Sequence, residues 1–238
     1  MRHLIRAASV LLLAGSVAAC IPILAPAAST PTPSPTPSPT PVSVLDAFRA
    51  KVASADFQAR GTVSGSVKAK LLLGSASGTV TGSFAVEGEA SDVSVGFTLL
   101  AINVTYDAIV VDGWSYARMN GGGWVKTRAT GKGFQETVGD LVLTDEGLAL
   151  RFGEWLHRIA AANPAAVDPA AFGIVTGAGQ ENLTISALTF WADADGMPAG
   201  VSIEASVDQK ILGSRAHETV TLEIAIDSLS GVTITAPV

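Results

Sequence analysis

The amino-acid sequence predicts an α+β domain built on a strongly curved antiparallel β-sheet, and three patterns support this prediction. Apolar and polar side chains alternate over long stretches from Phe57 onward, which is typical of half-buried strands. Glycines recur inside these stretches and allow strong curvature. Two further segments, residues 44–55 and 145–162, have the period of amphipathic helices.

The N-terminal segment has the three zones of a secretory signal. Arg2 and Arg6 supply positive charge, residues 7–14 are apolar but too short to span a bilayer, and small residues precede Cys20, the only cysteine. Ordinary secretory cleavage needs only the small residues, so the adjoining thiol needs its own explanation. The segment resembles a bacterial lipobox, which implies that Cys20 is acylated and becomes the mature N-terminus. The alternative is an ordinary cleaved signal with an incidental cysteine.

Charge and cysteine content restrict the classes of function. Removal of residues 1–19 leaves 219 residues with 13 basic and 21 acidic side chains, a formal charge of −8. A chain of this charge without a basic run is a poor candidate for binding nucleic acid or anionic lipid head groups as a whole. With its one thiol assigned to the anchor, the domain has no disulfide available, and its stability must come from core burial.

A proline-rich segment separates the signal from the domain. Residues 21–41 contain eight of the 12 prolines, which exclude helix and sheet. We expect residues 20–42 to form the acylated cysteine and an extended tether of about 60 Å. The domain is then predicted to span residues 43–238.

The domain is predicted to begin with a short helix and continue as a β-meander. Ser43 and Asp46 have the form of a capping box, and Leu45, Phe48 and Val52 share one face of the helix at 44–55. Strand alternation then covers four segments, residues 62–73, 80–87, 93–99 and 102–111.

Turn signals and aromatic residues follow the fourth of these strands. Asp112-Gly113 and residues 121–123 are hairpin turn signals. Trp114, Tyr116 and Trp124 cluster around the two turns. Such rings can line the mouth of a cavity or touch a membrane surface, and they can equally pack across strands.

The second predicted helix covers residues 145–162, because Leu148, Phe152, Trp155 and Ile159 fall on one helical face. Strand alternation returns in three segments, residues 183–187, 201–207 and 220–226. The sheet is therefore expected to have about nine or ten strands.

No residue set predicts catalysis, a metal site or a cofactor. Glu154 and His157 lie one helical turn apart in the predicted helix, but the further ligands of a di-metal site are missing. Asp193 and Asp195 flank a turn that is too short for an EF-hand loop. His217 stands beside Glu218 on a strand, so the two side chains are expected on opposite faces. We expect a protein that is not an enzyme.

The layout resembles a known family. It consists of a lipobox, a tether, a short helix, a glycine-punctuated meander, mid-chain helices and final strands. The most family-like stretches are residues 112–118 with 123–126, 145–150, 191–198 and 226–237. Over residues 43–237 the chain resembles the LppX/LprG-type lipoproteins, which are similar to the LolA/LolB lipoprotein carriers. The resemblance implies an unclosed antiparallel half-barrel, with a few helices closing one side of an apolar cavity that holds acyl chains.

The residues leave room for a cavity, because two short helices are few to cover the apolar face of so large a sheet, although the alternation alone favours a filled core. The candidate lining residues are Leu71, Leu73, Val80, Phe84, Val95, Phe97, Leu99, Leu148, Phe152 and Trp155. The expected function is binding and carriage of a lipid or another acylated amphiphile, such as one with a palmitoyl chain, across the cell envelope. The expected location is the extracytoplasmic side of a bacterial membrane. The alternative is an ordinary sandwich or barrel with a filled core, which would suit an envelope scaffold or sensor with a protein partner.

Overall fold

The structure, a computed structural model, describes residues 42–71, 74–99, 102–129, 132–167, 181–211 and 214–237. The chain divides into two units, residues 1–40 and residues 41–238, and all the described residues belong to the second. The predicted signal segment, Cys20, the proline-rich tether and the predicted lining residue Leu73 lie outside the described residues.

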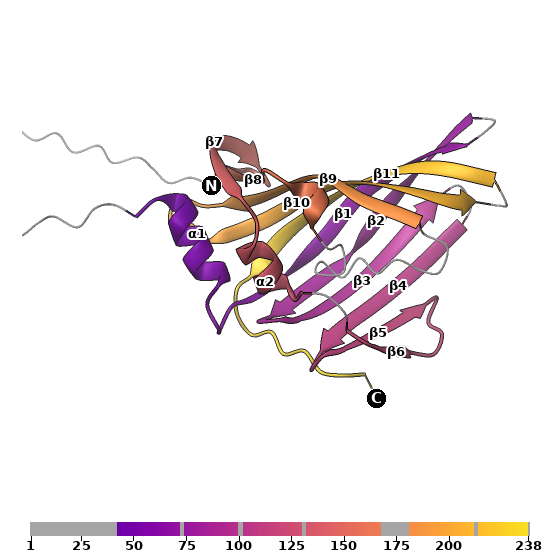
Figure 1. The fold of residues 1–238 in the computed structure, drawn as a ribbon, viewed down its shortest axis with the longest axis horizontal. Coiled ribbons are helices and arrows are strands. Elements are labelled where there is room, and N and C mark those ends of the chain that lie inside the picture. The colour runs from indigo at the N-terminus through magenta and orange to yellow at the C-terminus, as the bar shows by residue number, and fades with distance from the viewer. Residues whose placement is uncertain are drawn as a thin grey trace, which may run out of the picture. The chain divides into compact units, whose positions relative to one another are not determined.

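One antiparallel sheet dominates the described part of the chain (Figure 1). Its eleven described strands are β1 (Gln58–Leu71), β2 (Gly74–Glu87), β3 (Ala90–Leu99), β4 (Ile102–Val111), β5 (Trp114–Met119), β6 (Val125–Arg128), β7 (Leu143–Arg151), β8 (Glu154–Ala161), β9 (Glu181–Ala192), β10 (Pro198–Ile211) and β11 (Ser214–Ser228). The helices of the same described part are α1 (Val44–Val52), α2 (Phe134–Gly139) and the short 3-10 helix η1 (Pro164–Ala166). The fold is therefore mostly β rather than α+β, and the strands outnumber the nine or ten expected.

The strand order explains how a helix comes to cover one face. The order across the sheet is β6-β5-β4-β3-β2-β1-β11-β10-β9-β8-β7, so the first and last strands pair in the middle and β6 and β7 form the two edges. The chain runs outward from β1 to one edge, and the connection from β6 to β7 must then reach the opposite edge. This connection contains α2. The sheet is curved and does not close, as expected for a half-barrel.

Helix α1 forms where the sequence predicts it. The Ser43 hydroxyl accepts a hydrogen bond from the backbone N–H of Asp46 at 3.1 Å, which confirms the N-terminal cap. Phe48 and Val52 on the apolar stripe of the helix are buried. The Phe48 ring lies 5.4 Å from the ring of Phe190 in β9. The helix is therefore held against the sheet by its apolar side.

We call the face of the sheet that packs against α1 and α2 the inner face, and the opposite face the outer face. The main core lies on the inner face, where residues of α1 and α2 join those of eight strands. We also call the end of the sheet near the helices the helix end. Gly196, in the turn between β9 and β10, lies against α1 at this end. The opposite end, where β1 meets β2, β3 meets β4 and β10 meets β11, is the hairpin end.

The predicted helix at residues 145–162 is wrong, because this segment forms the hairpin of β7 and β8. Its turn consists of Phe152 and Gly153, which have φ values of 51° and 85°. Two successive residues with positive φ are typical of the type I′ turn that matches the twist of a hairpin. The apolar spacing that fits a helix fits two paired strands equally well, since Leu150 pairs with Trp155 across the turn.

A second apolar cluster lies on the outer face and includes the C-terminal segment. Val232 and Ile234 pack against Val111 and Tyr116, and Trp114 and Trp124 adjoin them. Two hydrogen bonds fix the segment: the Val232 N–H donates to Oε1 of Gln58 at 3.1 Å, and the Ile234 N–H donates to Oε2 of Glu87 at 2.8 Å. Trp114, Tyr116 and Trp124 therefore pack against other side chains on the outer face of the sheet.

Glycines in β1 and β2 permit the curvature. Gly61, Gly65, Gly78 and Gly82 occupy inner-face positions, and each faces a backbone carbonyl of the neighbouring strand. A Cβ on Gly82 would lie 2.1 Å from the Ser94 oxygen, and the distances at the other three are of similar size. Any side chain there would push two strands apart, so the bend of the sheet requires glycine at these positions.

We predict that Gly82→Ala lowers the free energy of unfolding by about 3 kcal/mol, because the added methyl group forces backbone to move. Gly96→Ala is the matched control. Gly96 lies in the neighbouring strand β3, and its Cβ would meet nothing closer than 3.7 Å. Alanine there should be neutral or stabilising by up to about 1 kcal/mol. Denaturant unfolding of both variants measures the difference, and equal effects would contradict this explanation of the curvature.

Candidate functional site

The candidate site is the inner face itself, and strand register decides which predicted lining residues belong to it. Val80 pairs with Phe97 and Phe84 pairs with Val93, which places these side chains on one continuous surface of β2 and β3. Val95 and Leu99 share that surface by alternation. Five of the predicted lining residues are therefore brought together: Val80, Phe84, Val95, Phe97 and Leu99. Leu71, the last residue of β1, pairs with Gly74.

Burial on the inner face of β3 and β4 falls from the helix end to the hairpin end. Along β4 the exposed fraction is 1% at Ala108, Tyr106 and Val104 are half-buried, and Ile102 is 48% exposed. Along β3 the same trend runs from buried Val93 to half-buried Leu99. Along β3 and β4 the inner face is therefore buried near the helix end and exposed near the hairpin end, whereas Ala69, Ala76 and Val207, near the hairpin end of β1, β2 and β10, are buried.

The helices close the helix end firmly. The rings of Phe57 and Phe134 stack with centroids 5.9 Å apart, which ties the start of β1 to α2. The Gln135 amide donates hydrogen bonds to the carbonyl oxygens of Val52 at 2.6 Å and Ser54 at 2.7 Å, which ties α2 to the end of α1. These contacts hold both helices over the same part of the sheet and leave the rest of the inner face to other groups.

Three exposed apolar side chains mark the uncovered part near the β6 edge. Ile102, Met119 and Val125 are 48%, 57% and 62% exposed. Met119 pairs with Tyr106 and Val125 pairs with Ala117, so all three residues lie on the inner side of the sheet, Ile102 at the hairpin end of β4 and the other two along the β5–β6 edge. We call these three residues the mouth. Exposed side chains of this size, clustered beside a half-buried apolar surface, are typical of a ligand or partner site.

The three lining residues predicted from the supposed helix behave differently from one another. Leu148 and Trp155 are 59% and 69% exposed and lie on the inner side of the β7–β8 hairpin, the side of buried Ile159. Phe152 does not line the inner face. Its ring lies over the outer side of β10, 2.3 Å from the place that a Cβ on Gly200 would take. The prediction for Phe152 is therefore wrong, because the turn carries its side chain to the opposite face.

Polar groups also face inward. The hydroxyl of Tyr106 is buried and has no hydrogen-bond partner among the described residues. Burial raises the pKa of Tyr106 to about 12, so the phenol stays protonated and can donate a hydrogen bond. Glu218, 6% exposed, lies at an inner-face position of β11 between Ala69 and Val207. The sequence pattern did not predict Tyr106 or Glu218 as a site residue, because each occupies an ordinary position in an alternating strand.

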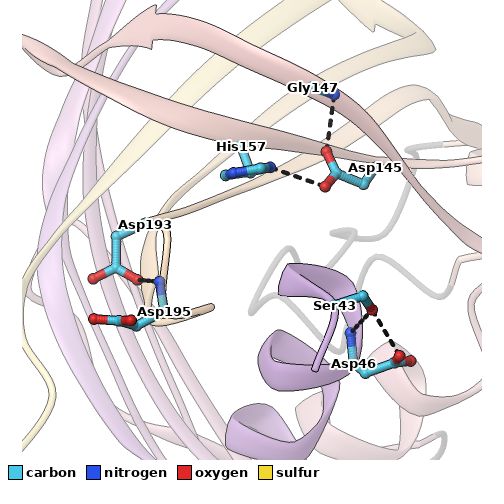
Figure 2. Close-up of polar contacts among 7 residues, drawn as sticks. All are labelled: Ser43, Asp46, Asp145, Gly147, His157, Asp193 and Asp195. Carbon is cyan, nitrogen blue, oxygen red and sulfur yellow. Dashed lines mark hydrogen bonds and ion pairs between the residues drawn. The ribbon is translucent and has the colours of Figure 1, made fainter. Parts of the chain in front are cut away.

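His157 has a partner that the sequence did not suggest. Its Nδ1 lies 2.9 Å from Oδ2 of Asp145, and the other carboxylate oxygen of Asp145 accepts the Gly147 N–H at 2.8 Å (Figure 2). The pairing with Glu154 expected from a helix does not occur, because the two residues lie on one strand, three positions apart. Among the described residues, no serine, threonine or cysteine hydrogen-bonds to His157. The contact fixes the orientation of the imidazole ring.

The Asp193–Gly196 turn is explained by its own hydrogen bonds. One oxygen of the Asp193 carboxylate accepts the N–H group of Asp195 at 2.9 Å (Figure 2). The same oxygen accepts the N–H group of Met197 at 2.8 Å. This arrangement stabilises the turn between β9 and β10. Within the described ranges, no group of three or more His, Cys, Asp or Glu side chains could hold a metal ion.

Comparisons with known proteins give little guidance. No family model and no curated protein matches the chain. A solved DUF1329 family protein from Desulfovibrio piger is 9% identical, with a TM-score of 0.31 over 77% of this chain and 93% of that chain. The domain of a putative outer membrane lipoprotein-sorting protein from Vibrio parahaemolyticus is 10% identical, with a TM-score of 0.30 over 78% and 89%. Similarities at this level carry no conclusion about function.

The helices of the described residues are all too short or too polar to cross a membrane.

We predict that Tyr106→Phe raises the free energy of unfolding of the ligand-free protein by about 1 kcal/mol, because it removes a buried hydroxyl that has no partner. Tyr116→Phe, on the outer face, is the control with the same change of atoms, and we expect its effect to be smaller. Thermal or denaturant unfolding measures both variants. A loss of stability in Tyr106→Phe would show that the hydroxyl is satisfied after all.

Proposed function

We propose that this protein is an exported, membrane-anchored lipoprotein that binds a lipid or another acylated amphiphile on its inner face and carries it across the cell envelope. In this proposal residues 1–19 are a cleaved signal, residues 20–42 carry the acylated Cys20 and the tether, and residues 43–238 form the lipid-binding domain. The role is non-catalytic: the domain shields acyl chains from water. The proposal includes a place in the LolA-like group of carriers, and within it the LppX/LprG type.

The observation that carries the proposal is the incomplete cover of the inner face. The mouth residues and the half-buried side chains of Phe97, Leu99 and Val104 form one apolar surface that α1 and α2 leave uncovered. Burying a methylene group contributes about 0.8 kcal/mol, so a palmitoyl chain has about 12 kcal/mol available before the costs of ordering it. That amount is sufficient for tight binding even if only part of the chain is buried.

The alternative with a filled core fits this burial pattern less well. A self-sufficient core would bury the inner-face side chains along the whole of β4, whereas the exposed fraction rises from 1% at Ala108 to 48% at Ile102. The exposed side chains of the mouth favour a domain that receives an apolar partner. The small, apolar nature of the exposed groups suits acyl chains better than a charged ligand.

The proposed anchor depends on Cys20 and is tested separately from the cavity. Its motivation is the lipobox-like stretch that ends at Cys20, followed by the proline-rich segment before α1. The intact mass of the exported protein should exceed that of residues 20–238 by the mass of attached acyl groups. A mature chain of bare polypeptide mass would contradict the anchor and would leave the binding proposal in place.

We predict that Val104→Trp weakens palmitate binding by about tenfold, because the larger ring takes up space on the inner face that the acyl chain would occupy. Thr105→Trp is the matched control, since Thr105 is the next residue of β4 and its side chain is exposed on the outer face. Isothermal titration of delipidated protein with palmitate gives both dissociation constants. Equal affinities for the two variants, or no binding by the unchanged protein, would contradict the proposed site.

A further inference from the structure

The hairpin end combines an exposed apolar side chain with exposed lysines. The mouth residue Ile102, which is 48% exposed, lies at this end on the inner side. On the outer side of β1, Lys68 pairs with Thr219 and Lys70 pairs with His217, and both lysines are exposed. Apolar and cationic groups therefore reach the same end of the sheet from its two faces.

The lysines border an open hollow of about 590 Å³, which Lys68, Lys70, His217 and Thr219 line together with small residues. Two carboxylates lie near it. Asp208 contacts Nδ1 of His217 at 2.9 Å, and Glu218 belongs to the inner face. The ammonium groups have no ion-pair partner among the described residues, whereas Arg118, Lys132 and Arg151 do. The hollow therefore presents two exposed ammonium groups without an ion-pair partner among the described residues, on a chain whose formal charge is −6.

The hairpin end is also the end opposite α1, near which the described residues begin. Helix α1 lies at the helix end against β7 and β10. Strand β1 has 14 residues, which span about 45 Å at 3.3 Å per residue. Lys68, Lys70 and Ile102 thus lie at the end of the domain opposite α1.

We propose that the hairpin end docks on the surface of a bilayer that contains anionic phospholipid, with Lys68 and Lys70 at the phosphate groups and Ile102 at the acyl boundary. The inference rests on the proposed function, because docking there opens the inner face directly to the acyl layer. Basic side chains are attracted to anionic lipid surfaces at short range, whereas the net negative charge of the chain acts against association of any other face. In this proposal cargo is exchanged at the hairpin end.

The test measures the partition of the full chain onto vesicles by co-sedimentation. Every protein compared carries Cys20→Ser, so that no acyl anchor forms and the N-terminal segment contributes equally. The vesicles are phosphatidylcholine with or without phosphatidylglycerol. Lys68→Gln combined with Lys70→Gln should weaken partition onto the anionic vesicles about 30-fold, since each lysine contributes roughly a factor of five. Partition onto phosphatidylcholine alone should not change.

The matched control is Arg49→Gln combined with Lys51→Gln, which removes the same charge from exposed residues of α1 at the helix end. It should leave partition unchanged. A second pair compares Ile102→Ser, in the mouth, with Val42→Ser, which is exposed next to α1. Only Ile102→Ser should weaken binding. Equal losses within either pair, or no loss in the lysine variant, would overturn the docking proposal.

Palmitate affinity of the same proteins separates this proposal from the proposed function. The lysine variant should bind palmitate as the unchanged protein does, because its altered side chains lie on the outer face. Lysine-dependent docking without any palmitate binding would contradict the cargo and leave the membrane contact standing. Palmitate binding without lysine-dependent docking would contradict the membrane contact and leave the proposed cargo standing.

Discussion

The rest of the fold depends on one constraint: neighbouring strands approach each other closely at glycine positions of β1 and β2. In β1 and β2 the inner-face glycines leave room for carbonyl oxygens that stand about 2 Å from where a Cβ would lie. The sheet bends there, and its inner face becomes the inside of a curve. Large residues occupy the positions opposite, as Phe84 stands opposite Gly61 and Val80 opposite Gly65. Glycines paired with bulky residues therefore determine both the bend of the sheet and the apolar surface on its inner face.

The chain path decides which part of that surface is covered. Because β6 and β7 form opposite edges, the segment between them has to cross, and α2 occurs in this segment beside α1. Both helices are short and are fixed to each other through Gln135. They cover the helix end of β3 and β4 and leave Ile102, at the opposite end of β4, exposed. An open, apolar end is unusual for a domain without a partner, and it gives the proposed carrier a direction of entry.

Much of the fold could be predicted from local patterns, and the failures have physical reasons. Asp112-Gly113 forms the expected turn, with φ values of 52° and 73°, because few other pairs tolerate two positive φ angles. The β7–β8 hairpin was missed because the turn pair Phe152-Gly153 places an aromatic residue where Asn or Asp is usual. The C-terminal cover of the outer face has no periodicity to reveal it. Among the site residues, Val80 and Phe97 follow from alternation, whereas the mouth depends on where the helices end, which no local pattern contains.

The central claim is that the protein's own side chains do not fill the inside of the curved sheet. Native mass spectrometry of the chain after purification without detergent tests this most directly. The account predicts species heavier than the covalent protein by one lipid or acylated molecule, which dissociates at raised collision energy. A single species of covalent mass, from a preparation whose melting temperature is unchanged by added fatty acid or phospholipid, would contradict it.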